Sequence, residues 1–89
     1  MHAVVVRVTI NDAERGEAML REEVIPRVSQ APGFVAGYWT RSDNSGMSMI
    51  VVEAEDTASS IAQMLESGEG LNDAVSLEGV EVREVVASA

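Results

Sequence analysis

Eighty-nine residues suffice for one domain with a small hydrophobic core. Hydrophobic residues make up 46% of the chain but aromatic residues only 3%, so the composition is that of a globular protein with a mainly aliphatic core. The net charge of -9, from 15 acidic and 6 basic residues, argues against nucleic acid as a partner because phosphate binding depends on clustered cations.

The chain has no cysteine and a single histidine, His2. Disulfides and thiolate metal sites are therefore excluded, and one histidine near the N-terminus cannot form a zinc or iron site by itself. We expect no metal and no cofactor. No apolar segment approaches roughly 18 residues, the length that a membrane helix needs, and the chain starts with a strand-like run instead of a signal peptide. We therefore expect a cytoplasmic protein that does not interact with membranes.

Residues 2–10 are rich in β-branched side chains and predict a strand. Asn11, followed by Glu14, resembles a capping box, and apolar residues at a spacing of four then predict a helix over 13–30. Pro26 lies inside this helix. Because proline removes one backbone hydrogen bond, we expect the last turns to be kinked or thinned.

Two strands joined by a tight turn are predicted next, over 34–42 and 47–54. Residues 43–46, Asp-Asn-Ser-Gly, have the composition of a four-residue hairpin turn. With a turn of that length, Trp39 on the first strand lies opposite Ile50 on the second.

A second helix is expected to be capped by Asp56 or Thr57 and to end at Gly68, because apolar residues recur there at helical spacing and glycine commonly ends a helix. A loop follows, and residues 80–86 predict the last strand. The order βαββαβ predicts an α+β, ferredoxin-like fold over residues 1–89, with a four-stranded antiparallel sheet and both helices on one face.

The alternation of residue types gives each strand one apolar side and one side that mixes apolar and charged residues. We expect the apolar side, which includes Trp39, to face the helices. The mixed side is too apolar for a solvated sheet face. We therefore predict a homodimer in which two sheets face each other and Arg7 and Arg83 pair with Glu53 and Glu81. The alternative is that these charges are scattered and face solvent. The residues predicted at the dimer interface are Arg7, Phe34, Tyr38, Met49, Val51, Glu53 and Arg83.

The segments EVIPRVSQAPGF, MIVVEAED and VEVREVV resemble the dimeric α/β-barrel superfamily, and within it the antibiotic-biosynthesis monooxygenase-like domains. The resemblance spans nearly the whole chain and rests on element order and on the Pro-Gly-Phe junction at 32–34. It implies a homodimer whose two sheets close a barrel, with a pocket between the helices and the sheet of each protomer. Some members oxidise polycyclic phenols without a cofactor, some degrade haem, and many have no known activity.

Two departures from the resemblance bear on chemistry. Ala54 stands where members often carry a tryptophan after the third strand. The tryptophan and histidine that haem-degrading members use are missing from the second helix and the loop after it, and only Asn11 is loosely placed to match their asparagine. Haem is therefore not expected.

Three residues are candidate ligand contacts. Trp39 could stack on a planar ligand and offer its indole N–H, although core packing explains it equally well. Arg41 could bind an anionic or phenolate oxygen at the pocket mouth, or be a surface arginine beside a turn. Asn11 is read as a helix cap that would position a substrate only if its amide pointed inward. No catalytic residue is identified, because the chain lacks a Ser-His-Asp set and a glycine-rich phosphate loop.

Two functions remain open. The first is a small-ligand-binding or assembly module without catalysis, whose partners are a second copy and a small aromatic ligand. The alternative is a cofactor-independent monooxygenase acting on a small polycyclic phenol or quinol, with Arg41, Asn11 and Trp39 stabilising the substrate anion. A cavity for a bicyclic molecule beside Trp39 would favour the enzyme.

Overall fold

The described residues form a four-stranded sheet and a layer of helices in the predicted order. The computed structural model describes residues 1–68 and 73–89. Neighbouring strands are antiparallel, in the order β2-β3-β1-β4. The predicted ferredoxin-like fold is confirmed. The elements are β1 (His2–Ile10), α1 (Ala13–Met19), η1 (Leu20–Val24), α2 (Ile25–Ser29), β2 (Phe34–Ser42), β3 (Ser45–Val52), α3 (Glu55–Glu66) and β4 (Val75–Glu84).

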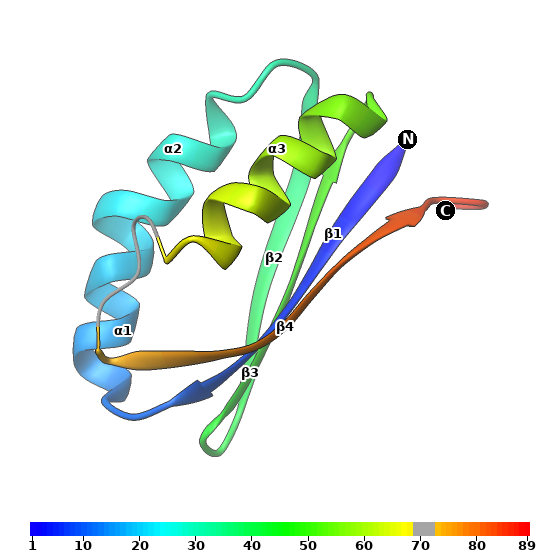
Figure 1. The fold of residues 1–89 in the computed structure, drawn as a ribbon. Coiled ribbons are helices and arrows are strands. Elements are labelled where there is room, and N and C mark those ends of the chain that lie inside the picture. The colour runs from blue at the N-terminus through cyan, green and yellow to red at the C-terminus, as the bar shows by residue number, and fades with distance from the viewer. Residues whose placement is uncertain (69–72) are drawn as a thin grey trace.

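The hydrophobic core lies between the helices and one face of the sheet, and no described part of the chain covers the other face (Figure 1). Val4 of β1 and Ile50 and Val52 of β3 are fully buried there. The helices contribute Val28 and Ala58, which are also fully buried. Because Trp39 packs against this cluster, the apolar sides of the strands face the helices as predicted.

The first helical segment is continuous from Ala13 to Ser29 but contains a π-helical turn, η1, before Pro26. The N–H of Ile25 donates to the carbonyl oxygen of Leu20, five residues back. Proline has no N–H to donate, so a wider turn ahead of it disturbs the helix less than a broken α-helical ladder. The irregularity therefore lies before Pro26 and widens the helix, whereas the turns from Ile25 to Ser29, predicted to be kinked or thinned, are α-helical.

The hairpin between β2 and β3 is tighter than predicted. Ser42 pairs with Ser45, which leaves only Asp43 and Asn44 in the turn, and Asp43 has the left-handed φ of 52° that aspartate tolerates. The predicted four-residue turn was wrong, and Trp39 pairs with Ser48 instead of Ile50. Since the register error is two residues, the side chains from Ala36 to Ser42 keep their predicted face.

A bulge at the start of β2 reverses the predicted face of Phe34. Phe34 pairs with Val52 and Ala36 with Val51, so Val35 is an extra residue on this strand. Phe34 packs against the core, whereas Val35 is 47% exposed. The prediction that Phe34 lies on the open face was wrong because a bulge shifts the alternation by one residue.

A second bulge explains why β4 starts earlier than predicted. Arg7 pairs with Gly79 and Val8 with Leu77, so Glu78 is the extra residue, and the strand begins at Val75 instead of residue 80. The bulge interrupts the alternation that marks a strand. The predicted loop therefore belongs partly to β4, while its residues 69–72 lie outside the described residues.

The predicted caps of both helices need correction. Asp12, not Asn11, is the N-cap of α1, and its carboxylate accepts a hydrogen bond from the N–H of Arg15 at 3.1 Å. The second helix, α3, starts after Ala54 without a side-chain cap, so the predicted caps at residues 56 and 57 were wrong. Its predicted end is confirmed, since Gly68 has a φ of 81°.

The open face of the sheet is apolar where β2, β3 and β1 meet. Tyr38, Met47 and Met49 are 67%, 52% and 45% exposed. Met49 pairs with Tyr38 on β2 and with Val5 on β1, and Val51 lies on the same face. These side chains form a continuous apolar patch of the kind that soluble proteins usually cover.

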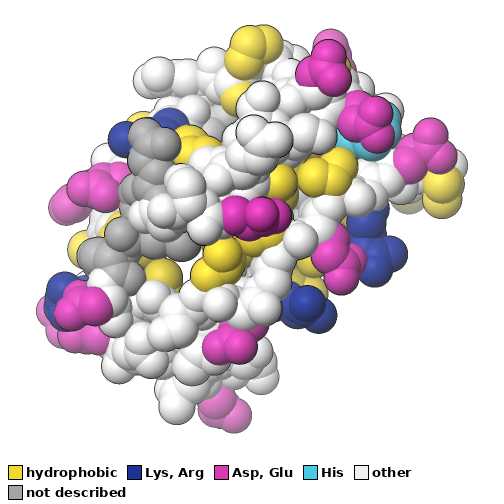
Figure 2. Space-filling view, viewed as in Figure 1, with side chains coloured by type: hydrophobic (Ala, Val, Ile, Leu, Met, Phe, Trp, Pro, Cys, Tyr) yellow, Lys and Arg dark blue, Asp and Glu magenta, His cyan; other side chains and the backbone are white. Residues whose placement is uncertain are grey.

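The predicted charged members of this face lie mainly toward β4. Arg83 pairs with Glu81 of the same strand at 2.7 Å. Arg7 lies against Gly79, where a Cβ atom would come 2.5 Å from its Nη2 atom. Glu53 lies beyond the end of β3. Acidic side chains are scattered over the side of the molecule shown in Figure 2, which also displays hydrophobic side chains at the surface between α3 and β4.

Candidate functional site

A cavity of about 170 Å³ lies between the first helical segment and the helix-facing side of the sheet, beside Trp39. Its wall is almost entirely apolar and includes Val6, Ile10, Met19, Ile50 and Leu65. An engineered apolar cavity of about 150 Å³ binds benzene. The enclosed space therefore matches about one aromatic ring, and a bicyclic molecule would have to extend through the mouth.

Two features of the backbone, the π turn and Gly46, leave the cavity unfilled. Leu20 and Val24, at the two ends of the π turn, both line the cavity, and π turns inside α-helices occur often at functional sites. On the sheet side, Gly46 is buried in the wall, where a Cβ atom would come 2.7 Å from Cγ2 of Val8. Glycine and the widened helix thus leave room that larger side chains or a regular helix would reduce.

Trp39 lines the cavity and also packs against the core, so both interpretations from the sequence describe part of its environment. Its indole lies across Gly37, two residues earlier on the same face of β2. A Cβ atom on Gly37 would come 2.6 Å from Cη2 and 2.7 Å from Cζ3 of the indole. The missing side chain at Gly37 therefore allows the ring to lie close against the strand at this position, which was not predicted from the sequence.

The mouth of the cavity carries an ion pair between β2 and α1. Nη1 of Arg41 lies 3.9 Å from Oε1 of Glu17, and the two side chains are 49% and 57% exposed. Arg41 thus lies where a mouth residue was predicted. Glu17 was not predicted as a site residue, although it is an acidic residue at a position of the first helix where the spacing predicts an apolar one. Since the pair is exposed, it contributes little to stability and is free to exchange partners with a ligand.

Ser48 adds a neutral polar group to the wall. It lies on β3 opposite Trp39, in the helix-facing layer. The sequence did not single it out because the predicted turn placed Ile50 opposite Trp39. The predicted register also put Ser48 on this face, but opposite Arg41, and the two-residue turn brings it opposite Trp39 instead.

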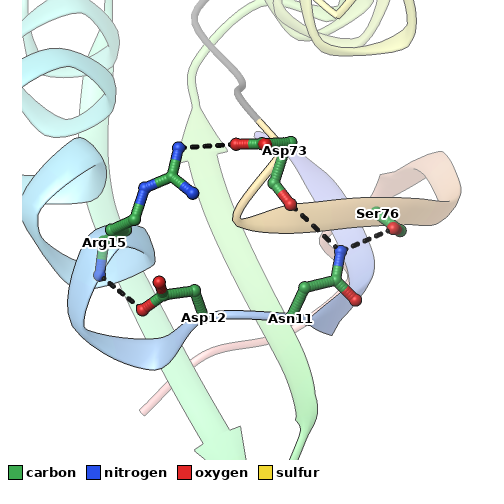
Figure 3. A network of polar contacts seen from close by, with 5 residues as sticks. All are labelled: Asn11, Asp12, Arg15, Asp73 and Ser76. Atoms are coloured by element: carbon green, nitrogen blue, oxygen red, sulfur yellow. Dashed lines mark hydrogen bonds and ion pairs between the residues drawn. The ribbon is translucent and has the colours of Figure 1, made fainter.

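Asn11 does not line the cavity. Its amide nitrogen donates to the carbonyl oxygen of Asp73 at 3.2 Å and to Oγ of Ser76 at 2.9 Å, while Arg15 pairs with the Asp73 carboxylate at 2.6 Å (Figure 3). The network joins the start of α1 to the start of β4. The predicted ligand contact for Asn11 was therefore wrong, because its amide is turned toward β4.

Within residues 1–68 and 73–89, no group of three or more histidine, aspartate or glutamate side chains is arranged to hold a metal ion. Over the same ranges, no helix has the length and apolar character needed to cross a membrane.

The fold is shared with solved structures of a cofactor-independent oxygenase. SnoaB from Streptomyces nogalater is 19% identical, with a TM-score of 0.76 over 98% of this chain and 94% of its own. A SnoaB variant with one asparagine replaced by alanine is 20% identical, with the same TM-score and coverage. No family model matches the sequence, and no curated protein matches it. The resemblance drawn from the sequence is thus confirmed for the fold.

Proposed function

We propose that this protein binds a small phenol or quinol in the cavity beside Trp39 and oxidises it with molecular oxygen, without a metal or organic cofactor. The observation that carries this proposal is an apolar cavity with an arginine at its mouth, in a fold shared with SnoaB, a cofactor-independent oxygenase. The cavity holds about one ring and not a bicyclic molecule, so the enzyme is favoured over the non-catalytic module by Arg41 at the mouth and by the likeness to SnoaB, and not by the size of the cavity.

The chemistry requires a substrate that is easily deprotonated and oxidised. A substrate CH₂ group, activated by a phenolic ring system, loses a proton, and its anion passes one electron to oxygen. The two radicals combine to a hydroperoxide, which loses water and leaves a carbonyl group. Both hydrogens of the CH₂ group and one oxygen atom leave as water, and the other oxygen atom stays in the product.

The residues at the mouth can serve the first step. Arg41 is a permanent cation that can stabilise the developing oxyanion, which is often the largest single contribution to such a reaction. Glu17, beside it, is the carboxylate in the cavity wall and can accept the proton. Trp39 supplies a flat apolar surface against which the ring can stack.

The non-catalytic module is the second candidate. One observation favours it: Glu17 and Arg41 are the ionisable side chains among the described wall residues, and they already pair with each other. In that case the cavity only holds a ring, and the ion pair stays at the mouth.

Oxygen consumption with a reduced anthrone-like substrate separates the two functions. If the protein is an oxygenase, we expect oxygen consumption in the presence of a metal chelator. Arg41→Ala should then lower kcat/KM at least tenfold. Saturable binding without oxygen uptake would favour the module. Absence of any saturable binding would refute both.

We also propose that two copies pair through their open sheet faces. The exposed apolar patch of Tyr38, Met47 and Met49 supports this arrangement, because water contact with such a surface is unfavourable.

A further inference from the structure

Ser48 is the neutral hydroxyl that β3 contributes to the cavity wall. It pairs with Trp39 of β2 on one side and with Val6 of β1 on the other. Val6 is a buried core residue, so the Ser48 side chain also lies in the helix-facing layer. A hydroxyl can donate one hydrogen bond and accept others. Ser48 can therefore meet either a hydroxyl or a carbonyl group of a ligand.

The Ser48 hydroxyl has no hydrogen-bond partner within residues 1–68 and 73–89. Over these residues, Nδ1 of His2 is the side-chain polar atom that is buried from solvent and has no hydrogen-bond partner, and Oγ of Ser48 is not such an atom. The Ser48 oxygen is therefore not sealed inside the core, and the space available to it on the helix-facing side is the cavity. An apolar ring placed there would remove water from this oxygen without replacing its hydrogen bond, which is unfavourable.

From this geometry we propose that Ser48 determines specificity by hydrogen-bonding an oxygen substituent at the inner end of an aromatic ring held against Trp39. This inference rests on the proposed function, because it requires an aromatic ligand in the cavity. The pair formed by Arg41 and Gly46 lies two residues from the Trp39 and Ser48 pair, about 7 Å along the strand. A single oxygen-bearing ring thus spans the distance from Ser48 toward the mouth.

The ligand class follows from the size of the cavity and from this hydroxyl. About one ring is enclosed, so the ligand is a single-ring phenol or a larger molecule whose terminal ring carries the oxygen. The rest of a larger molecule leaves the cavity between Glu17 and Arg41.

The test compares para-cresol with para-xylene, which has a methyl group in place of the hydroxyl. Binding is followed by heteronuclear NMR through the indole resonance of Trp39, the single tryptophan. We expect the wild-type protein to bind para-cresol about three- to tenfold more tightly. Ser48→Ala should remove this preference by lowering the affinity for para-cresol, while the affinity for para-xylene should stay the same or rise, because no hydroxyl is then desolvated by the ring. Ser48→Thr keeps the hydroxyl and should retain the preference. Ser60→Ala, an exposed serine on α3, is the matched control.

Binding of para-xylene that is at least as tight as in the wild-type protein shows that the cavity of the Ser48→Ala protein is intact. A preference for para-cresol that survives Ser48→Ala would overturn the inference and would assign the oxygen to another group, such as Arg41. Equal binding of both compounds by the wild-type protein would also overturn it, while leaving the aromatic cavity of the proposed function in place. If neither compound bound, the proposed function and this inference would fail together.

Discussion

Replacing Gly37 by alanine should displace the indole of Trp39. The added Cβ atom would come 2.6 Å and 2.7 Å from two ring atoms, about 1 Å closer than an ordinary carbon–carbon contact. The backbone at Gly37 is not left-handed, so alanine is allowed there and the ring must move instead. Overpacking of this kind costs about 1–3 kcal/mol, reduced by the 0.4–1 kcal/mol that alanine gains by restricting the unfolded chain. We expect a net loss of about 1–2 kcal/mol.

The assay is chemical denaturation monitored by Trp39 fluorescence, together with the emission maximum of the folded protein. Gly16→Ala on α1 is the matched control, because its Cβ atom would lie 3.5 Å from Cγ1 of Val75, an ordinary contact. Alanine is also the better helix former, so this variant should be about 0.5–1 kcal/mol more stable.

A double-mutant cycle isolates the clash. In a Trp39→Phe background, the smaller ring should relieve most of the cost of Gly37→Ala, giving a coupling of about 0.5–2 kcal/mol. If Gly37→Ala left both the free energy of unfolding and the emission maximum unchanged, or if the cycle showed no coupling, the close approach of indole and glycine would be refuted.

Further predictions concern assembly and the network beside β4. The protein should sediment as a homodimer at micromolar concentration, and Met49→Asp should yield a folded monomer, because Met49 is already 45% exposed in one protomer; a monomeric wild type would contradict the proposed interface. Asn11→Ala should lower the free energy of unfolding by about 1 kcal/mol through the loss of its two hydrogen bonds to the start of β4. The same variant should bind para-cresol with unchanged affinity in the NMR titration, and a large loss of binding would restore Asn11 as a ligand contact.

Features that depend on residue periodicity were predictable from the sequence. The β-branched run of β1 and the helical spacing in α3 predicted those elements correctly, since period two and period 3.6 are local properties of the chain. The helix-facing side of Trp39 was also correct, because an error of two residues in the turn leaves the face unchanged.

Features that depend on pairing between distant residues were not predictable in this way. The bulges at Val35 and Glu78 each insert one residue into a strand, which reversed the face of Phe34 and hid the first half of β4. Which residue becomes the extra one is decided by the partner strand and by packing. A local sequence pattern contains no information about the partner strand or about packing.

The cavity is a result of tertiary structure for the same reason. Arg41 could be placed at its mouth because it lies two residues from Trp39, on the same face of one strand. Glu17 and Ser48 join it only when α1 packs over the sheet and the two-residue turn sets the register of β3. A cavity is space that neighbouring side chains leave unfilled, so its volume depends on how the packed elements meet and is not a property of any one segment.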